Sequence, residues 1–340
     1  MSERNITPQE FLRQTKAKES SPFPRRTPSP EFLRIHIEQT KSADCSTVNP
    51  EEFFDEFFTS ILKDLIELLD SPLKEDAQRQ LAIGCVDHAE ANAYILRDGS
   101  QNCYAIVLNG ALINLLNHYV KLIQASQHPE SIVYSSEKLT ERREFPPVMS
   151  KMLSDYIATG VPSGPELKIR IDSNAMKFVE VSLRFIYRFI TAHELGHFIG
   201  GDLDSPKNFA VPMWNENVSV FSKNISHEME FKADIIAFGL LLRLVAEEAP
   251  QFPAGMVFEL SVKVLFNLFR ELNDVGCSTH PPSSARMLVI AHHFFGEEAA
   301  IALRFSFDDL SYLTIFHNLI GGVTVSDLIQ GDRGPIQIAN

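Results

Sequence analysis

The sequence predicts a mainly helical α+β protein with a small antiparallel sheet. Short apolar runs separated by turn residues gather in residues 80–108, which is typical of strands. Over most of the remaining chain, apolar residues recur at helical spacing, and no internal repeat is visible. The 340 residues are 44% hydrophobic and 22% charged, a composition typical of a globular protein with a sizeable core.

The N-terminal part of the chain divides at Asn49. Residues 1–48 begin with a polar, proline-dotted stretch and predict a flexible arm. Asn49 can cap a helix, and Pro50 suits its first turn. The aromatic stripe in EFFDEFFTSILKDLIELL is interpreted as the buried face of this helix.

Three runs, QLAIGCVDH, ANAYIL and NCYAIVL, predict the strands of the sheet. The turn signal Asp98-Gly99-Ser100 joins the last two as an antiparallel hairpin, and the helix GALINLLNHYVKLIQAS follows directly. Residues 127–165 are polar and contain five prolines. We expect them to form a lid-like insertion with some helix around Val148–Ile157.

The second half of the chain is predicted to be almost entirely helical. Asp172 or Ser173 opens a long helix, which the glycine pair Gly200-Gly201 stops. Four more helices are expected near residues 226–248, 254–273, 281–296 and 307–319. We expect a single domain over 49–330, followed by a tail at 331–340.

The net charge, the cysteines and the apolar runs of the sequence predict the kind of partner and the cellular location of the protein. The formal net charge of −13 is unfavourable for contact with phosphate backbones or anionic membranes, so neither nucleic acid nor membrane is expected as a partner. The four cysteines form no C-x-x-C pair and predict free thiols. The N-terminus lacks the apolar stretch of a secretory signal, and the longest apolar run, Ile235–Leu242, is too short to cross a bilayer. We therefore expect a soluble, cytoplasmic protein.

The segment TAHELGHFIGGD, residues 191–202, predicts a metal site on the long helix. Residues four apart lie on one helix face, so His193 and His197 can chelate a single cation. Glu194 is turned by about 100° from His193, which places it beside the metal. There it can take a proton from a water that the metal activates. The pattern predicts one Zn²⁺ per chain, with Glu194 as general base.

A catalytic zinc has three protein ligands and one open position, so another ligand is needed. The downstream segment SHEMEFKADIIAFGLLL offers Glu230. Asp234 follows one turn later and can accept the N–H of a ligating histidine. Glu228 and His227 are alternative ligands, although the residue four after Glu228 is Lys232, a poor partner for a histidine. The spacing favours Glu230 and leaves both alternatives open.

The combination of HELGH with E-x-x-A-D at residues 230–234 resembles the gluzincin metallopeptidases. The segment STHPPSSARM, residues 278–287, is similar to the H-P-x-x-x-x-R element of their Ste24/HtpX-like (M48-type) branch. ANAYIL and AIVLNGALINLL are similar to the strands of that branch, and all segments come in the family's order. The lack of transmembrane helices fits soluble relatives such as the Lit-like phage-exclusion peptidases. The resemblance covers residues 85–330, and the 127–165 insertion stands out from it.

This resemblance implies a metallopeptidase domain whose small sheet lies next to the zinc-binding helix. It implies His193, His197 and Glu230 as zinc ligands, Glu194 as the base and Asp234 as the supporting carboxylate.

The resemblance also assigns residues outside the zinc ligands. It places a histidine that stabilises the transition state on His280. It places an arginine that orients the site or helps to hold the oxyanion on Arg286. In this family a peptide substrate adds to an edge strand, which here matches Tyr104, Ala105, Ile106, Val107 and Leu108.

The expected function is that of a soluble zinc-dependent metalloendopeptidase with a protein or peptide substrate and a regulatory or defence role. An activating partner is compatible with such a role, and the sequence does not specify one. The alternative is a catalytically inactive regulatory or binding module of the same fold, in which the metal is structural.

Overall fold

The fold is known from a computed structural model of the chain. It describes residues 6–19, 50–86, 88, 91–98, 102–135, 139–159, 169–203, 225–272, 280–307 and 311–330. Contacts divide the chain into two compact units, Met1–Val179 and Glu180–Asn340, whereas the sequence predicts one domain over 49–330. Residues 20–48 of the expected arm and the expected tail lie outside the described residues.

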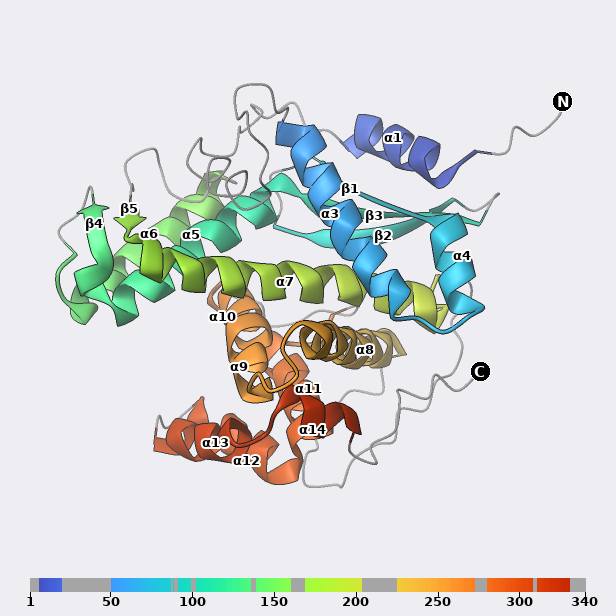
Figure 1. Ribbon diagram of the computed structural model, residues 1–340. Helices are drawn as coiled ribbons and strands as arrows, with labels where there is room; N and C mark the ends of the chain where they lie inside the picture. The colour runs from blue at the N-terminus through green and yellow to red at the C-terminus, as the bar shows by residue number, and fades with distance from the viewer. Residues whose placement is uncertain are drawn as a thin grey trace, which may run out of the picture. The chain divides into compact units, whose positions relative to one another are not determined.

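The first unit contains a three-stranded sheet (Figure 1). Its strands are β1 (Leu81–Val86), β2 (Ala93–Asp98) and β3 (Cys103–Asn109), in the order β1-β3-β2. The β2–β3 pair is antiparallel, which confirms the predicted hairpin. The β1–β3 pair is parallel, so the sheet is mixed rather than purely antiparallel. The mainly helical α+β class is confirmed.

Strand β3 lies in the centre of this sheet. Tyr104 pairs with Leu81 on one side and with Arg97 on the other, and all residues of the strand are buried. The prediction that Tyr104–Leu108 form a substrate-binding edge strand is therefore wrong. The hairpin turn was visible in the sequence, whereas the parallel partner β1 joins β3 without a local turn signal.

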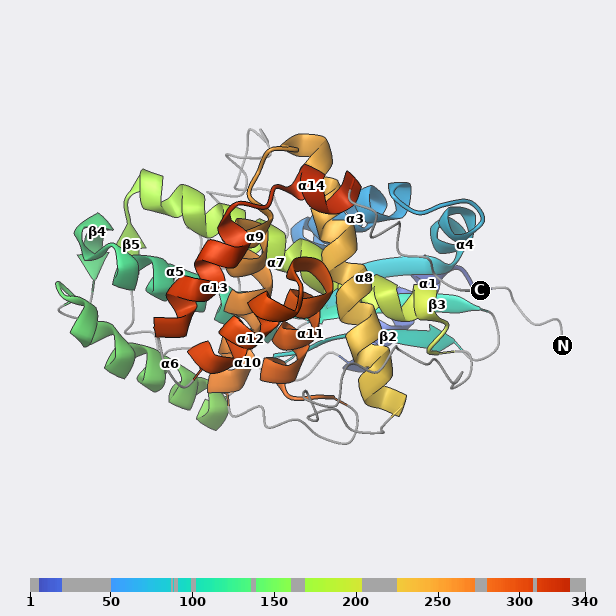
Figure 2. The ribbon, with the colours of Figure 1, turned by 90° about the horizontal axis from the view of Figure 1, so that it is seen from below.

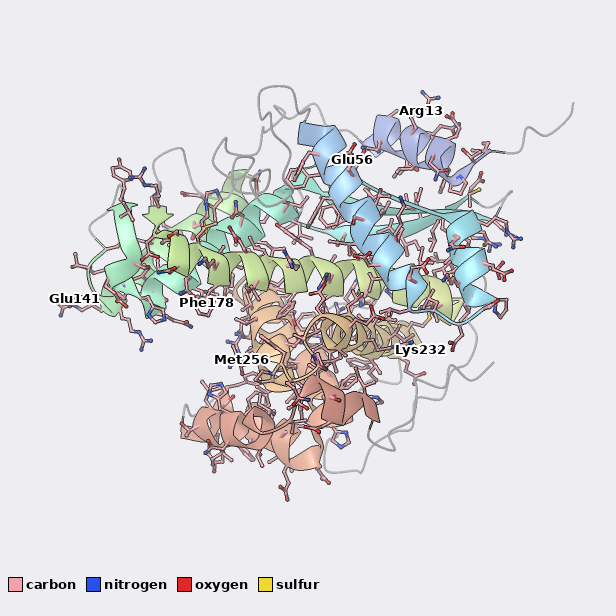
Figure 3. All side chains as sticks on the ribbon, in the orientation of Figure 1. Arg13, Glu56, Glu141, Phe178, Lys232 and Met256 are labelled. Atoms are coloured by element: carbon pink, nitrogen blue, oxygen red, sulfur yellow. The ribbon has the colours of Figure 1, made fainter. Side chains whose placement is uncertain are left out.

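Helix α1 (Pro8–Glu19) covers one face of the sheet. Leu12 is buried in a cluster with residues of β1 and β3, namely Ala82, Val86, Ala105 and Val107. Arg13, on the next position, points away from the sheet into solvent (Figure 3). The prediction of a flexible arm is thus wrong for this stretch, because burial of Leu12 anchors an otherwise polar helix.

Helix α3 (Pro50–Glu67) packs against β1, and α4 (Leu73–Gln80) leads into that strand. Phe53, Phe54 and Phe58 of the predicted aromatic stripe are buried. Asp55 on α3 accepts the backbone N–H of Cys85 at 2.8 Å. Its second oxygen forms an ion pair with Lys16 of α1 at 2.5 Å. One carboxylate therefore satisfies a donor on the outer edge of β1 and joins α1, α3 and the sheet.

The expected insertion contains regular structure in its described part. Helix α5 (Gly110–Gln127) leads into a short antiparallel pair, β4 (Ile132–Ser135) with β5 (Ile169–Ile171). Helix α6 (Phe145–Thr159) confirms the predicted helix around 148–157 and extends it. The expectation of a lid-like loop is wrong for these elements, because β4 finds its partner beyond the insertion.

The long helix α7 (Ser173–Gly200) begins and ends as predicted. Asp172 accepts the backbone N–H groups of Asn174 and Ala175, each at 2.8 Å, which caps its first turn. The helix starts in the first unit and continues into the second.

The described part of the second unit is helical. Figures 1 and 2 show α8 beside the C-terminal half of α7. The elements are α8 (Ile225–Glu248), α9 (Ala254–Phe258), the π-turn (Glu259–Lys263), α10 (Val264–Glu271), α11 (Ser283–Phe295), α12 (Glu297–Ser306), α13 (Ser311–Gly321) and α14 (Val325–Gln330). The predicted helix at 254–273 is interrupted by a π-helical turn. The helix predicted at 307–319 corresponds to α13, whereas α12 and α14 were not predicted.

Helix α8 is the centre of the core of this unit. It is buried around most of its circumference between Phe231 and Val245, which is typical of a helix enclosed by others. The ring of Phe238 lies 4.9 Å from that of Phe294 and 5.9 Å from that of Phe258. No described helix is long and apolar enough to span a membrane. Cys85 and Cys103 are buried free thiols, as predicted, while Cys45 and Cys277 lie outside the described residues.

Substitution of Asp55 tests its role at the edge of β1. Asp55→Ala is expected to lower the free energy of unfolding in urea by about 1–3 kcal/mol, because the Cys85 N–H loses its acceptor. Asp55→Asn retains an acceptor oxygen and should cost less. Asp155→Ala, which removes the exposed Lys151–Asp155 pair, is the matched control and should change stability by about 0.5 kcal/mol or less. Equal losses for Asp55→Ala and Asp155→Ala would contradict this role.

Candidate metal site

The backbones of α7 and α8 approach each other at Gly196. A Cβ atom built on Gly196 would lie 3.0 Å from the Cα of Ala233 and 3.3 Å from its Cβ, closer than side chains normally pack. Glycine in HELGH and alanine in E-x-x-A-D thus permit one close helix contact. Glu230 lies one turn before Ala233, so the same contact brings its carboxylate towards the histidines on α7.

His193, His197 and Glu230 form a triangle of residues, in which the two histidine nitrogens face different oxygens of Glu230. The Nε2 atoms of the two histidines are 3.2 Å apart. Glu230 Oε2 lies 3.4 Å from His193 Nε2, and Oε1 lies 3.5 Å from His197 Nε2. Two ligands about 2.0–2.1 Å from zinc at tetrahedral angles are about 3.3–3.4 Å apart. These separations are compatible with a tetrahedral cation of this size held by the two imidazoles and the carboxylate of Glu230.

The surroundings of Glu230 support a cation at this position. Its Oε2 is buried and makes no hydrogen bond within the described chain, and its nearest cationic partners, His193 and Arg286, lie 3.4 and 3.5 Å away, so the oxygen can still accept a closer cation. A donor set of two histidines and one glutamate is also typical of catalytic zinc. Glu228 and His227, the alternative ligands, do not belong to the metal-holding group found among the described residues.

A buried carboxylate and an arginine orient His193. Its Nδ1 lies 3.0 Å from Asp234 Oδ1, so Nδ1–H donates to the aspartate and the Nε2 lone pair is left for a metal. Arg286 on α11 donates through Nε and Nη2 to both oxygens of Asp234, each at 2.7 Å. Its remaining nitrogen, Nη1, lies 3.5 Å from Glu230 Oε2. The predicted partnership of Asp234 with a ligand histidine is thus present, and Arg286 holds that aspartate.

His197 has its own carboxylate, which was not predicted from the sequence. Asp202 Oδ2 accepts Nδ1–H of His197 at 2.8 Å. At the end of α7, Gly201 has φ +68°, its N–H donates to Phe198 O, and the N–H of Asp202 donates to His197 O. This is a Schellman motif, which folds the chain back over the last helical turn. The signal was present in GGD, where an acidic residue directly follows the helix-stopping glycines.

The buried carboxylates of the site favour a positive charge on or beside His193. Burial lowers the pKa of His193, but Asp234 and Glu230 outweigh this effect and raise it to about 10. Burial would raise the pKa of Glu230, yet His193 and Arg286 bring it far below its usual value. Burial also opposes ionisation of Asp234, and Arg286 again lowers its pKa. The carboxylates that favour a proton on His193 equally favour a cation beside it.

The other residues that the sequence predicts for the site differ in their exposure to solvent. Glu194 is buried, and burial raises the pKa of its carboxyl. His280 precedes α11, with its side chain 55% exposed and Nε2 3.6 Å from Glu230 Oε1, so it lies at the rim of the group. The structure thus brings His280 and Arg286 to the same glutamate, while Tyr104–Leu108 belong to the other unit.

The geometry defines a class of site: a buried pair of histidines and a glutamate that could hold one metal ion, with a carboxylate on each histidine. No family model, curated protein or solved structure matches the chain. The interpretation of the site therefore depends on its own residues and distances.

Replacement of Asp202 tests whether it supports the ligand His197. Asp202→Ala should weaken Zn²⁺ binding by about 10- to 100-fold, because the imidazole loses the acceptor that sets its tautomer and orientation. Competition with a chromophoric chelator measures this change. Asp202→Asn keeps an acceptor oxygen and should lose less affinity. If Asp202→Ala bound Zn²⁺ as tightly as the wild type, the assigned role would be incorrect.

Proposed function

We propose that the protein is a zinc metalloendopeptidase of the gluzincin type. The observation that carries the proposal is the triangle of His193, His197 and Glu230, whose separations of 3.2–3.5 Å are compatible with a tetrahedral zinc site. Glu194, buried directly beside the first ligand, supplies the general base that such chemistry requires. The resemblance of the three motif segments to the gluzincins and their Ste24/HtpX-like branch supports the same class.

In this proposal the metal and the protein side chains supply different parts of the catalytic chemistry. Zinc, when bound by the two histidines and Glu230, polarises the scissile carbonyl and makes a water more acidic. Glu194 accepts the proton of that water and later donates it to the leaving amine. Because burial raises the pKa of Glu194, its carboxyl is better matched to both transfers than an exposed glutamate would be.

His280 and Arg286 take different parts in this proposal. The half-exposed imidazole of His280 at the rim of the site can donate a hydrogen bond to the oxyanion of the tetrahedral intermediate. Arg286 is buried and uses Nε and Nη2 on Asp234, so its role is to orient the site rather than to hold the oxyanion.

The proposed substrate is a protein or peptide, and the proposed setting is a regulatory or defence role in the cytoplasm. The strongly acidic chain, with a formal net charge of −13, supports a partner other than nucleic acid or an anionic membrane. An activating partner is compatible with this role because proteolysis inside a cell has to be restrained.

Substitution of the base separates metal binding from cleavage. Glu194→Gln should retain about one zinc per chain while peptide hydrolysis falls by about 10²–10⁴-fold, since the amide cannot accept the proton. Elemental analysis measures the metal, and mass spectrometry of lysate proteins incubated with each variant measures cleavage. Glu228→Gln, on the neighbouring helix, is the matched control and should keep both properties.

The outcomes of this experiment separate the two functions considered. Cleavage that persists in Glu194→Gln would refute the mechanism. Stoichiometric zinc in a wild type that cleaves nothing would favour the inactive module with a structural metal.

Substitution of His280 tests oxyanion stabilisation. His280→Ala should lower kcat by about 10²–10³-fold with little change in KM, because the lost hydrogen bond forms mainly in the transition state. Steady-state kinetics on a cleaved peptide provides the measurement. Zinc content and thermal stability should stay at wild-type values, since this side chain is 55% exposed. A rise in KM at unchanged kcat would assign His280 to substrate binding instead.

A further inference from the structure

Phe266 on α10 lies next to the metal site, where it contacts Arg286 and Phe189. Its side chain is buried, and its ring centre lies 4.7 Å from the guanidinium carbon of Arg286. The same ring meets Phe189 edge-on, with centroids 5.9 Å apart and planes at 88°. Phe189 is one turn ahead of His193 on α7. Phe266 therefore contacts both the metal-bearing helix and the arginine that holds Asp234.

We propose that Phe266 is a positioning residue for the metal site and that it acts through Arg286. This inference rests on the proposed metal site. The nitrogens at the edge of the guanidinium are directed to Asp234 and Glu230, which orients Arg286 within its plane. Phe266 supplies an aromatic surface near the same group and restricts how it can tilt. Such cation–π contacts are strongest when the cation is desolvated, as it is here.

The path from Phe266 to the metal position consists of direct contacts. Arg286 holds both oxygens of Asp234, and Asp234 Oδ1 receives Nδ1–H of His193. A tilt of the guanidinium would move the aspartate oxygens, and the imidazole would follow them. Metal affinity is sensitive to such partners of ligating histidines. The contribution of Phe266 should therefore appear in metal affinity and ligand geometry.

The π-helical turn Glu259–Lys263 explains how Phe266 reaches this place. The wider turn accommodates an extra residue, and each residue in an α-helix corresponds to a rotation of about 100°. The turn therefore changes the face that α10 presents relative to an unbroken α-helix. The hydroxyl of Ser182 on α7 donates to the carbonyl of Leu260 within this turn at 2.6 Å. That bond ties the turn to the metal-bearing helix and fixes α10 beside it.

The chain offers a matched control for loss of the ring. Phe258 lies on the same helical run, is also buried, and meets Phe238, Phe295 and Phe316. These three aromatic partners lie outside the metal network, whereas the ring of Phe266 contacts Arg286 within it. Leucine at either position conserves most of the volume and removes the aromatic face, so both variants should lose similar core packing.

The experiment compares Phe266→Leu, Phe258→Leu and the wild type as full-length proteins. Zn²⁺ affinity is measured by chelator competition, and the visible spectrum of bound Co²⁺ reports ligand geometry. Phe266→Leu should bind Zn²⁺ five- to thirtyfold more weakly, a change of about 1–2 kcal/mol, and should shift the Co²⁺ bands. Phe258→Leu should stay within twofold of the wild type with an unchanged spectrum. Phe266→Met provides a second measurement if the leucine variant does not fold.

A double-mutant cycle with Arg286→Lys tests whether Phe266 acts through the arginine. Lysine lacks the planar fork, so the Phe266→Leu change should have less effect on Zn²⁺ affinity in the Arg286→Lys background than in the wild type. Equal effects in both backgrounds would overturn the proposed route. So would an affinity of Phe266→Leu less than threefold below that of Phe258→Leu. A wild type that binds no Zn²⁺ would refute the proposed function and this inference together, whereas a zinc-binding wild type with an insensitive Phe266 would refute the inference alone.

Discussion

The buried carboxylate of Asp234 is the charge on which the candidate metal site depends. It is fully buried, and such a charge is costly unless it is paired and hydrogen-bonded. Arg286 pairs with both oxygens, and His193 donates to one of them. Removal of either partner would leave charge uncompensated inside the protein. The orientation of the first histidine and the packing of α8 against α11 therefore rest on the same interaction.

The two histidines of the site are supported in physically different ways. His193 depends on a tertiary pair whose members are 52 residues apart in the chain. His197 depends on a local Schellman motif that returns Asp202 to the helix only five residues later. The local support requires only a glycine that adopts positive φ. The tertiary support is present only when α7, α8 and α11 are packed correctly. An intact site therefore indicates that this unit is correctly folded.

Helix spacing constrains the metal triangle as strongly as the ligands do. Gly196 and Ala233 allow the backbones of α7 and α8 to approach until a Cβ on the glycine would collide. Larger residues at this contact would separate the helices, and Glu230 would move away from the histidines. The apolar cluster of Phe231, Ala285 and Val289 then holds α8 against α11, beside the charged residues of the site. The apolar contact and the site residues therefore lie on adjacent faces of α8.

The local features of the protein could be predicted from its sequence. Helical periodicity, a capping aspartate and terminal glycines define α7, and the i, i+4 spacing places His193 and His197 on one face of any helix. The β2–β3 hairpin follows from its turn residues in the same way. Such features depend on residues only a few positions apart, and the geometry of a single element determines them.

Features that depend on contacts between distant residues are determined only by the tertiary structure. Among the described residues it places Glu230, rather than Glu228 or His227, in the group that could hold a metal ion, because the position of α8 against α7 determines which side chain meets the histidines. It placed β3 in the centre of the sheet through a parallel strand, and it anchored α1 through Leu12. It also brought Phe266 to Arg286 through a π-turn that periodicity does not reveal. Sequence patterns predict which side chains share one face of a helix or strand. Which other element packs against that face is determined only when the helices pack together.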